Sequence, residues 1–589
     1  MCLLIEKMEG LKSSSSLSVA NDKFTKTNEY MHIESQMDSN LKNVILNAKK
    51  VNKSLVLVCG NSGDGKSHLI ANFLNNGVIS QEEFDVYIDA TSSDKKGVRA
   101  NERLRTKLDE FSDSKLLDDT TYRLIVAINL GVLNDFLKNY ENEFTSLKKY
   151  VDSQGLFDNN PSWRDYSKKN DSSAKSDYLF GHVDFTSFHR IELCQTGLDT
   201  SFFSNLFRKI ITDSPDNEIF GAFCKECTNC TRKERCPVYW NYRELRDNQI
   251  LREHVIYVIS KAIIKANLSP SVREINNLFY ELIVGGAQDE PQSLSDPIER
   301  LLHLITNSTL WLLYESHEGL LQYVSSEDVL SDPRRSCDKE LIALNLKPDF
   351  EKWLLENGVN ASPMFKQIYN DILYCKNKNG KKYRDRETEI KQAIFKLYIR
   401  TNSIKNTTDI PYSTYLEFLF NYNIGKEDKC KDLIQLIEEC VYLWNGRLSD
   451  KSGSNIKNGV IIYRVSDKYY LYKKLEVRFH KDISIKELSP DVVLPYFSFS
   501  MRFRFKLKES NTIIPLDVDF ELYHFLLEVK NGYMPTNSDK KRNVKYDSFV
   551  RNLISDSDSD TYVYTRNDEG KTYKISKDDF DRYRFDYEV

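Results

Sequence analysis

The chain has 589 residues, and at about 150 residues per domain this length predicts roughly four domains. Hydrophobic residues make up 40% and charged residues 29%, which is typical of a folded protein and excludes wholesale disorder. With 83 Lys and Arg against 87 Asp and Glu the net charge is −4, so any nucleic-acid site must be a local basic patch. No run of about 18 apolar residues and no signal-peptide layout occurs, so we expect a cytoplasmic protein without a membrane span.

Changes in composition and periodicity along the chain predict five segments. A polar, flexible N-terminal arm comes first, and an α/β core follows it. A Cys-rich metal clip with a helical lid, a helical domain and an α+β C-terminal domain complete the order. The predicted segments are 1–42, 43–205, 206–290, 291–450 and 451–589.

Three short apolar runs predict buried strands in the α/β core. They occupy residues 55–59, 86–88 and 124–128, with helical patterns between them. Buried strands that alternate with helices are typical of a parallel sheet. After the first run comes a glycine-rich stretch and then an apolar helix, which Asn76 and Gly77 should end.

Residues 60–67 match the pattern G-x-x-x-x-G-K-[ST] in the context that the pattern requires, between a buried strand and a helix. Glycines let backbone N–H groups wrap phosphates, and the helix N-terminus adds a positive dipole. Lys66 would bridge the β- and γ-phosphates, and Ser67 would bind Mg²⁺. The predicted ATP-contacting residues are Gly60, Asn61, Ser62, Gly63, Asp64, Gly65, Lys66, Ser67 and His68.

Hydrolysis of ATP needs further groups from neighbouring elements. Asp89, after the second strand, is the candidate second Mg²⁺ ligand, although the usual Asp-Glu pair is missing and a turn-capping role is the alternative. Asn129 ends the third strand and could place the attacking water. Arg273 begins a helix and could reach the γ-phosphate from a lid, or simply lie on the surface. Arg334 and Arg335 could act as arginine fingers between the subunits of a homo-oligomer.

Four of the 11 cysteines form a C-x2-C-x2-C-x5-C segment that Pro237 follows. Four thiolates suit a structural, tetrahedral Zn²⁺ and would leave no open position for catalysis. The spacing also resembles a ferredoxin run, so an iron–sulfur cluster is one alternative and a site without metal is another. The predicted ligands are Cys224, Cys227, Cys230 and Cys236.

A second enzymatic pattern lies near the C-terminus. Asp517, Glu528 and Lys530 resemble the Asp…Glu-x-Lys pattern of metal-dependent nucleases, which gives an alternative function. The apolar spacing of residues 520–530 nevertheless predicts a helix, on which residues two apart point about 200° away from each other. That arrangement would not bring Glu528 and Lys530 to one metal.

Two basic stretches are candidates for contact with DNA. Residues 497–508 alternate apolar and polar side chains strictly, which predicts a half-buried strand with a basic outer side. A second basic cluster lies within 540–545. Phosphate contact requires only Lys and Arg on a shared face, and a solvated surface is the alternative.

Several of these segments together carry a family resemblance. They are 59–69, Asp89-Ala90-Thr91, 127–134 around Asn129, the four-cysteine segment, Asp332-Pro333-Arg334 and 529–535. In them the chain resembles the DptF family, the ATPase components of bacterial DNA phosphorothioation-dependent restriction systems. The similarity runs over most of the sequence, and Ser92 departs from it, because an acidic residue is expected there.

The resemblance implies an AAA-like P-loop ATPase subunit that couples its nucleotide state to restriction of unmodified DNA. It implies the companion subunits DptG and DptH, and it implies that phosphorothioated host DNA is spared. It assigns nucleotide binding to residues 60–67 and assigns no catalytic base. A nucleotide-binding scaffold or switch without appreciable turnover is the alternative function.

Overall fold

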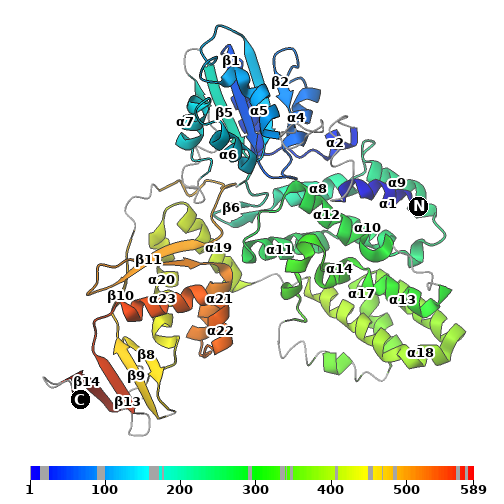
Figure 1. Cartoon of the computed structure of the whole chain (residues 1–589). Helices are drawn as coiled ribbons and strands as arrows, with labels where there is room; N and C mark the ends of the chain where they lie inside the picture. Colours follow the sequence, from blue (N-terminus) through cyan, green and yellow to red (C-terminus); the bar gives the residue numbers. More distant parts are fainter. Residues whose placement is uncertain are drawn as a thin grey trace. The chain divides into compact units, whose positions relative to one another are not determined.

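The computed structural model shows two compact units, each described here by itself (Figure 1). The first comprises Met1–Glu192 and Asp199–Thr408, and the second comprises Leu193–Leu198 and Asp409–Val589. The structure describes residues 2–12, 26–88, 100–157, 172–174, 178–186, 188–288, 295–331, 339, 341–344, 346, 349–404, 409–448, 456–466, 468–481, 487–565, 571–577 and 582–588.

The first unit contains the predicted α/β core. Its sheet has the strand order β2-β3-β1-β5-β4, in which the first four strands are parallel and β4 is antiparallel to β5. The three predicted strands are confirmed, and β5 is a fourth that the sequence analysis did not identify. The strands are β1 (Lys53–Cys59), β2 (Asp85–Tyr87), β3 (Tyr122–Ile128), β4 (Ser172–Ala174) and β5 (Tyr178–Asp184).

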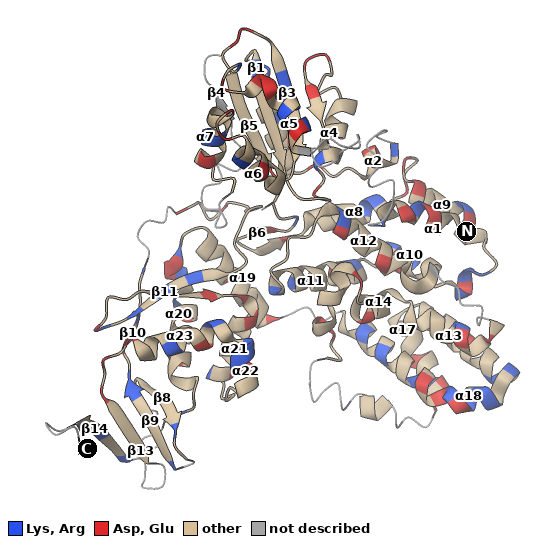
Figure 2. Ribbon diagram, in the orientation of Figure 1, with Lys and Arg blue, Asp and Glu red and all other residues tan. Residues whose placement is uncertain are grey.

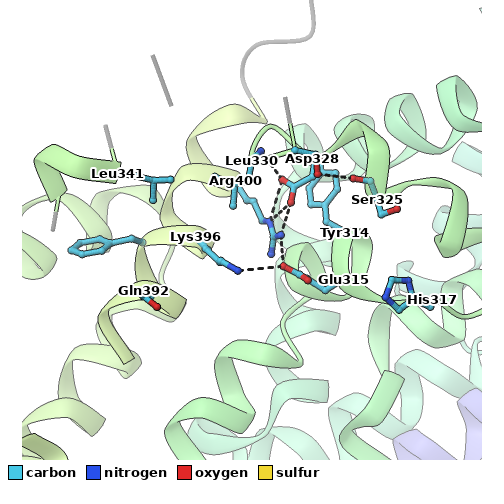
Figure 3. A pocket seen from close by; sticks show the side chains of 12 residues that line it. Tyr314, Glu315, His317, Ser325, Asp328, Leu330, Leu341, Gln392, Lys396 and Arg400 are labelled. Atoms are coloured by element: carbon cyan, nitrogen blue, oxygen red, sulfur yellow. Dashed lines mark hydrogen bonds and ion pairs between the residues drawn. The ribbon is translucent and has the colours of Figure 1, made fainter. Parts of the chain in front are cut away.

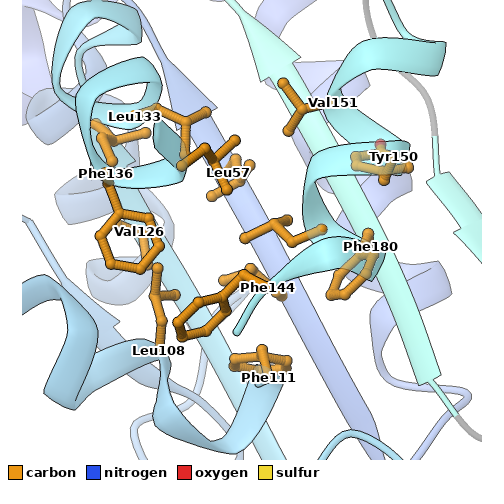
Figure 4. Packing of buried hydrophobic residues seen from close by; sticks show 14 of the residues in the cluster. Leu57, Leu108, Phe111, Val126, Leu133, Phe136, Phe144, Tyr150, Val151 and Phe180 are labelled. Atoms are coloured by element: carbon orange, nitrogen blue, oxygen red, sulfur yellow. The ribbon is translucent and has the colours of Figure 1, made fainter. Parts of the chain in front are cut away.

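Helices cover both faces of this sheet. On one face, alternate residues of β1 and β3 pack with the aromatic side chains Phe111, Phe136 and Phe144 in one hydrophobic cluster (Figure 4). On the other face α3 packs against β1 and β5. Burial on both faces explains why β1 reads as a continuous apolar run. The helices are α3 (Gln36–Ala48), α4 (Lys66–Asn75), α5 (Ala100–Leu108), α6 (Leu130–Asn139) and α7 (Thr145–Ser153), with the 3-10 helix η3 (Asp109–Phe111).

The chain before α3 also forms helices that pack on the first unit. α1 (Leu3–Met8) packs on α9 (Glu218–Glu226), and the 3-10 helix η1 (Glu9–Leu11) packs on α12 (Val272–Ile283). Met8 at the end of α1 is fully buried. α2 (Lys26–Met31) then contacts α8 (Ser201–Ile211).

The rest of the first unit is helical, as the sequence predicts. Its longest helix, α18 (Met364–Ser403), is interrupted at Asn379 and carries interspersed acidic and basic residues (Figure 2). Such mixing is typical of a solvated helix face. The other elements are α10 (Pro237–Asp247), α11 (Gln249–Lys265), α13 (Pro297–Thr306), α14 (Thr309–Glu315), α16 (Phe350–Trp353), α17 (Val359–Ala361), the π-helix η11 (Leu354–Gly358) and the 3-10 helices η5 (Cys227–Asn229), η6 (Lys233–Arg235), η7 (Gly285–Gln288), η9 (Gly319–Tyr323) and η10 (Ser325–Glu327).

The second unit is α+β and begins earlier than the predicted boundary after residue 450. Its first helices pack with the C-terminal elements because the apolar face of α20 contacts α21 and β8. Two antiparallel sheets follow, β10-β11-β12 and β15-β14-β13-β9-β8. The helices are α19 (Ile410–Asn423), α20 (Lys431–Leu443), α21 (Phe520–Lys530), α22 (Asn537–Arg542) and α23 (Val544–Ser555). The strands are β8 (Gly459–Arg464), β9 (Tyr469–Lys474), β10 (Val477–Phe479), β11 (Met501–Leu507), β12 (Ile514–Val518), β13 (Thr561–Thr565), β14 (Lys571–Lys577) and β15 (Tyr583–Glu588).

The second unit also includes residues 193–198, which lie in the hairpin of β6 (Glu192–Cys194) and β7 (Gly197–Asp199). Within that unit the backbone N–H and C=O of Leu193 exchange two hydrogen bonds with Leu494, of 3.0 and 2.9 Å. This hairpin follows β5 closely in the sequence, so the chain passes from the α/β sheet into the second unit and back.

The alternating segment 497–508 is a strand only in part, because β11 starts at Met501. The backbone N–H of Ser498 donates to Asn423 Oδ1 at 2.9 Å, and the Ser498 hydroxyl donates to the Ser500 carbonyl at 2.7 Å. These side-chain bonds offer the backbone an alternative to the sheet ladder. Among the described helices, none is long and apolar enough to cross a membrane.

Candidate functional site

The predicted phosphate loop lies where the central strands of the parallel sheet end. The pairing aligns Cys59 at the end of β1 with Ile128 of β3 and Asp184 of β5. Gly60 N–H donates to the Ile128 carbonyl at 3.1 Å, which fixes the start of the loop. Open α/β sheets bind ligands outside the carboxyl ends of their strands, so the loop has the expected position for a ligand site.

Two glycines let the loop adopt a backbone conformation that other residues rarely adopt. Gly63 and Gly65 have φ angles of 92° and 98°, in the left-handed region that other residues rarely adopt. The helix α4 begins directly after Gly65, so its N-terminus faces the loop. Lys66 Nζ donates to the carbonyls of Gly60 and Asn61 at 2.8 and 2.6 Å. The lysine therefore turns back over the loop rather than away from it.

Asn129 lies beside the loop, as predicted from its place after β3. Its Oδ1 accepts the Gly131 N–H at 2.8 Å and so caps α6. Its Nδ2 donates to Asn61 Oδ1 at 3.4 Å. The Asn129 side chain thus both caps α6 and contacts the loop.

Arg273 also reaches the loop, through the first turn of α12. Its backbone N–H donates to the Gly63 carbonyl at 3.4 Å. A Cβ placed on Gly63 would lie 3.1 Å from Ser271 Oγ and 3.3 Å from Arg273 Cβ, so this turn packs directly on the loop. Ser271 and Glu274 form a capping box that fixes the turn. The predicted lid helix is therefore in contact with the loop.

Arg190 is a site residue that the sequence analysis missed. Its Nη2 donates to the Asp64 carbonyl at 2.8 Å, and its guanidinium lies 4.9 Å from the Phe188 ring centroid. Arg190 is 9% exposed. The residue stands 126 positions from Asp64 in the sequence and belongs to no motif, so only the fold brings it to the loop.

The loop aspartate, Asp64, is largely shielded from solvent. Burial raises its pKa above the ordinary value, against the opposing effects of the Asn61 N–H and of the charges on Lys66 and Arg190. Asp64 Oδ2 accepts the Asn61 N–H. The site therefore combines two cationic side chains with one partly buried carboxyl group.

His68 connects the loop helix to the N-terminal segment. Its Nε2 lies 3.1 Å from His32 Nδ1, and His32 Nε2 lies 2.8 Å from Asp38 Oδ1. Burial, together with the charge of the nearby His32, lowers the pKa of His68 to about 4. His68 is thus neutral near pH 7. His68 contacts this histidine–aspartate pair, and a direct contact with ATP stays a prediction.

Three predicted site residues lie outside the described residues. Asp89, the candidate Mg²⁺ ligand, follows β2 and Ile88. Arg334 and Arg335, the candidate arginine fingers, lie between described residues 331 and 339. Their roles stay predictions.

The four clustered cysteines run from the last turn of α9 to the N-terminus of α10. Cys227 is buried, Cys236 is half-buried, and Cys224 and Cys230 are exposed. Among the described residues, no group of three or more Cys, His, Asp or Glu side chains already stands in position to hold a metal. The predicted Zn²⁺ or iron–sulfur site stays a prediction.

The nuclease-like residues do not converge. α21 spans Phe520–Lys530, which confirms the predicted helix. Asp517 forms two hydrogen bonds with Arg502, of 2.7 and 2.9 Å, and Lys530 Nζ lies 2.9 Å from Glu439. Glu528 lies two positions before Lys530 on the helix and so faces another direction. The arrangement gives no shared metal position for the three side chains.

In both basic stretches at least one basic side chain is already bound to another residue of the chain, so neither is a fully free phosphate-binding face. On β11, Arg502 is paired with Asp517, as described above. In the second stretch, Lys540 Nζ donates to Asn445 Oδ1 at 2.6 Å. Exposed Lys541 and Arg542 follow in α22. DNA contact at either stretch stays a prediction.

A cavity of about 580 Å³ lies elsewhere in the first unit, around the buried Arg400 (Figure 3). Arg400 Nη2 donates to Glu315 at 2.7 Å, and its Nε donates to Asp328 at 3.2 Å. Lys396 lies at the rim, 3.9 Å from Glu315. The two carboxylates balance the two cations, so the cavity has no excess charge with which to select an ion.

The chain was compared with protein-family models, with curated proteins and with solved structures, and no match was found in any of the three comparisons.

Proposed function

We propose that the chain is a P-loop ATPase that binds ATP and Mg²⁺ at residues 60–67. The observation that supports this most strongly is the convergence on the loop of three residues from separate elements, two through their side chains and Arg273 through its backbone N–H. Asn129 follows β3, Arg190 follows β5 and Arg273 begins α12, and each contacts the loop by a hydrogen bond. A glycine-rich turn without a ligand would not require these polar groups around it.

Each residue then has a defined role in the reaction of ATP with water to give ADP and phosphate. Lys66 neutralises charge on the β- and γ-phosphates, and Ser67 with Asp89 holds Mg²⁺. Mg²⁺ supplies charge neutralisation when it is bound. The Asn129 amide orients the attacking water, and Arg273 approaches the γ-phosphate from α12. Arg190 keeps the loop in its binding conformation by its bond to the Asp64 carbonyl.

We further propose that this ATPase serves a phosphorothioation-dependent restriction complex of the DptF type, with DptG and DptH as companions. What supports this is the resemblance of six segments, among them residues 127–134 and the cysteines. In this role the nucleotide state would control restriction of unmodified DNA. The nuclease alternative is less favoured, because Asp517 is engaged by Arg502 and α21 separates Glu528 from Lys530.

A switch that binds ATP without turnover is the second candidate. The observation that favours it is the missing Asp-Glu pair after the strand that precedes Asp89. Binding and turnover measured on the same preparation separate the two functions. Tight ATP binding with turnover no faster than that of Lys66→Ala would establish the switch and exclude the ATPase.

The experiment for the restriction role is steady-state ATP turnover of the full chain, alone and with DptG and DptH. It is measured without DNA, with unmodified DNA and with phosphorothioated DNA of the same sequence. We expect turnover that unmodified DNA stimulates more than modified DNA, and that Lys66→Ala abolishes. Equal turnover in all three conditions, with and without the companions, would contradict the coupling.

A further inference from the structure

The N-terminal helix brings a fifth cysteine to the cysteine segment. Leu3 N–H donates to Glu226 Oε2 at 2.9 Å, and Lys7 Nζ pairs with Glu218 at 2.8 Å, so α1 lies along α9. Cys2 directly precedes Leu3, and Cys227 directly follows Glu226. The interaction of the two thiols lowers the pKa of Cys2 and raises the pKa of Cys227. A residue 225 positions away from Cys227 in the sequence is thereby its neighbour in space.

Two more thiols lie close to this pair. Cys227 interacts electrostatically with both Cys230 and Cys236, and Cys236 interacts with Cys2 as well. Tight turns hold the segment, since Cys230 N–H donates to the Cys227 carbonyl at 3.3 Å and Cys236 N–H donates to the Lys233 carbonyl at 3.1 Å. Cysteines from two distant parts of the chain therefore lie near one another, although among the described residues no three of them already stand in position to hold a metal.

Backbone N–H groups are directed at three of these sulfurs. The Arg232 N–H donates to Cys230 Sγ at 3.4 Å. Cys236 precedes α10 and accepts N–H groups of the first turn, and Cys2 does the same at the start of α1. Burial raises the pKa of the Cys236 thiol and its backbone bonds only partly oppose this, so metal binding would displace a proton there.

Cys224 has a different environment. Its thiol is exposed, whereas that of Cys227 is buried, and it adds to the effect of Asp247 in raising the pKa of Arg246. Its carbonyl accepts the Thr228 hydroxyl at 2.6 Å in the last turn of α9. Of the four cysteines clustered in the sequence, this exposed one therefore lies near a guanidinium group.

We propose that the chain binds one structural Zn²⁺ through Cys2, Cys227, Cys230 and Cys236, and that Cys224 is not a ligand. Thiolates select zinc over harder ions, and four of them complete a tetrahedral site. The described residues hold no preformed metal-ligating group, so binding draws the four sulfurs together. Metal binding and local ordering are coupled in sites of this kind. The ion would fasten α1 to the turns between α9 and α10.

The test is the metal content of the purified full chain, with any tag at the C-terminus. The variants Cys2→Ser, Cys227→Ser and Cys236→Ser are compared with Cys224→Ser as the matched control. We expect about one zinc per chain in the wild type and in Cys224→Ser, and a loss of most of it in the other three. Retention in Cys2→Ser with loss in Cys224→Ser would overturn the assignment. Iron with visible absorption, or no bound metal, would overturn the zinc site.

A second measurement uses only the wild-type chain, so it does not depend on the folding of a variant. The native protein is alkylated with and without prior removal of metal by a chelator, and each cysteine is then quantified by mass spectrometry. We expect Cys2, Cys230 and Cys236 to be protected until metal is removed, and the exposed Cys224 to react equally in both samples. Protection of Cys224, or unchanged reactivity of Cys2, would contradict the proposal.

Discussion

The Nη2 atom of Arg190 donates to the backbone carbonyl of Asp64 at 2.8 Å, which ties the segment after β5 to the middle of the phosphate loop. A buried, charged donor of this kind contributes about 1.5–3 kcal/mol, which corresponds to roughly 10- to 100-fold in binding. We therefore expect Arg190→Ala to weaken ATP binding by at least about tenfold, as measured by isothermal titration.

The control for Arg190 is Arg208→Ala, which removes an exposed arginine of α8 in the same unit. ATP affinity should be unchanged in that variant. If Arg190→Ala and Arg208→Ala bind ATP equally well, the loop does not depend on the Arg190 bond.

The helix cap and the amide contact that Asn129 makes can be separated by two different substitutions. Ser is as good an N-terminal helix cap as Asn, but it lacks the amide donor that points at Asn61. We expect Asn129→Ser to keep the unfolding midpoint close to that of the wild type and to lower kcat of ATP turnover by roughly 100-fold. Asn129→Ala should also lose the cap, at a cost of about 1 kcal/mol in the free energy of unfolding. A normal kcat in Asn129→Ser would remove Asn129 from the reaction.

The lowered pKa of His68 implies that the stability of the chain depends on pH. Its pKa is about 4 in the folded chain and about 6.5 when unfolded, so between these values the unfolded state binds the extra proton. Stability should therefore rise with pH from about 4 to 6.5. The contribution is at most about 3.5 kcal/mol, at about 1.4 kcal/mol per pKa unit.

We expect His68→Asn to reduce the difference between the denaturant midpoints at pH 4.5 and pH 7. Part of the slope should remain, because burial also lowers the pKa of His254 to about 4. His317→Asn, at an exposed position of the same unit, is the control and should keep the wild-type slope. An unchanged slope in His68→Asn would contradict the burial of a neutral His68.

Replacing Arg400 should strongly lower the stability of the chain and leave the phosphate loop unaffected. It is 1% exposed, and its substitution by Met leaves the buried Asp328 without its cation. We expect Arg400→Met to lower the free energy of unfolding by about 3 kcal/mol or more. Lys396→Met, at the rim of the same cavity, should change it by less than about 1 kcal/mol. Similar denaturant midpoints for the two variants would show that the buried pair adds little.

The phosphate loop was predictable because its chemistry lies in one run of eight residues between a buried strand and a helix. The helix α21 was predictable for a similar reason, since its apolar spacing and its end at Asn531 are local. β5 was missed because Gly181, His182 and Asp184 interrupt the apolar pattern. Its burial depends on the strands and helices around it, which no local pattern records.

Arg190 and Cys2 could not be predicted, because their partners are 126 and 225 residues away in the sequence. Nothing in a local pattern distinguishes Arg190 from a surface arginine. The spacing of Cys224 with its neighbours favoured a local set of ligands, whereas α1 places Cys2 beside Cys227. Long-range contacts of this kind follow from the fold and not from motif spacing.

The most direct test of the central claim is equilibrium binding of ATP, with Mg²⁺, to the full chain and to Lys66→Ala. Lys42→Ala, which removes an exposed lysine of α3, is the matched control. We predict that the wild type and Lys42→Ala bind ATP equally, and that Lys66→Ala binds at least about tenfold more weakly with an unchanged unfolding midpoint. Equal affinity of all three proteins would contradict a nucleotide site at residues 60–67.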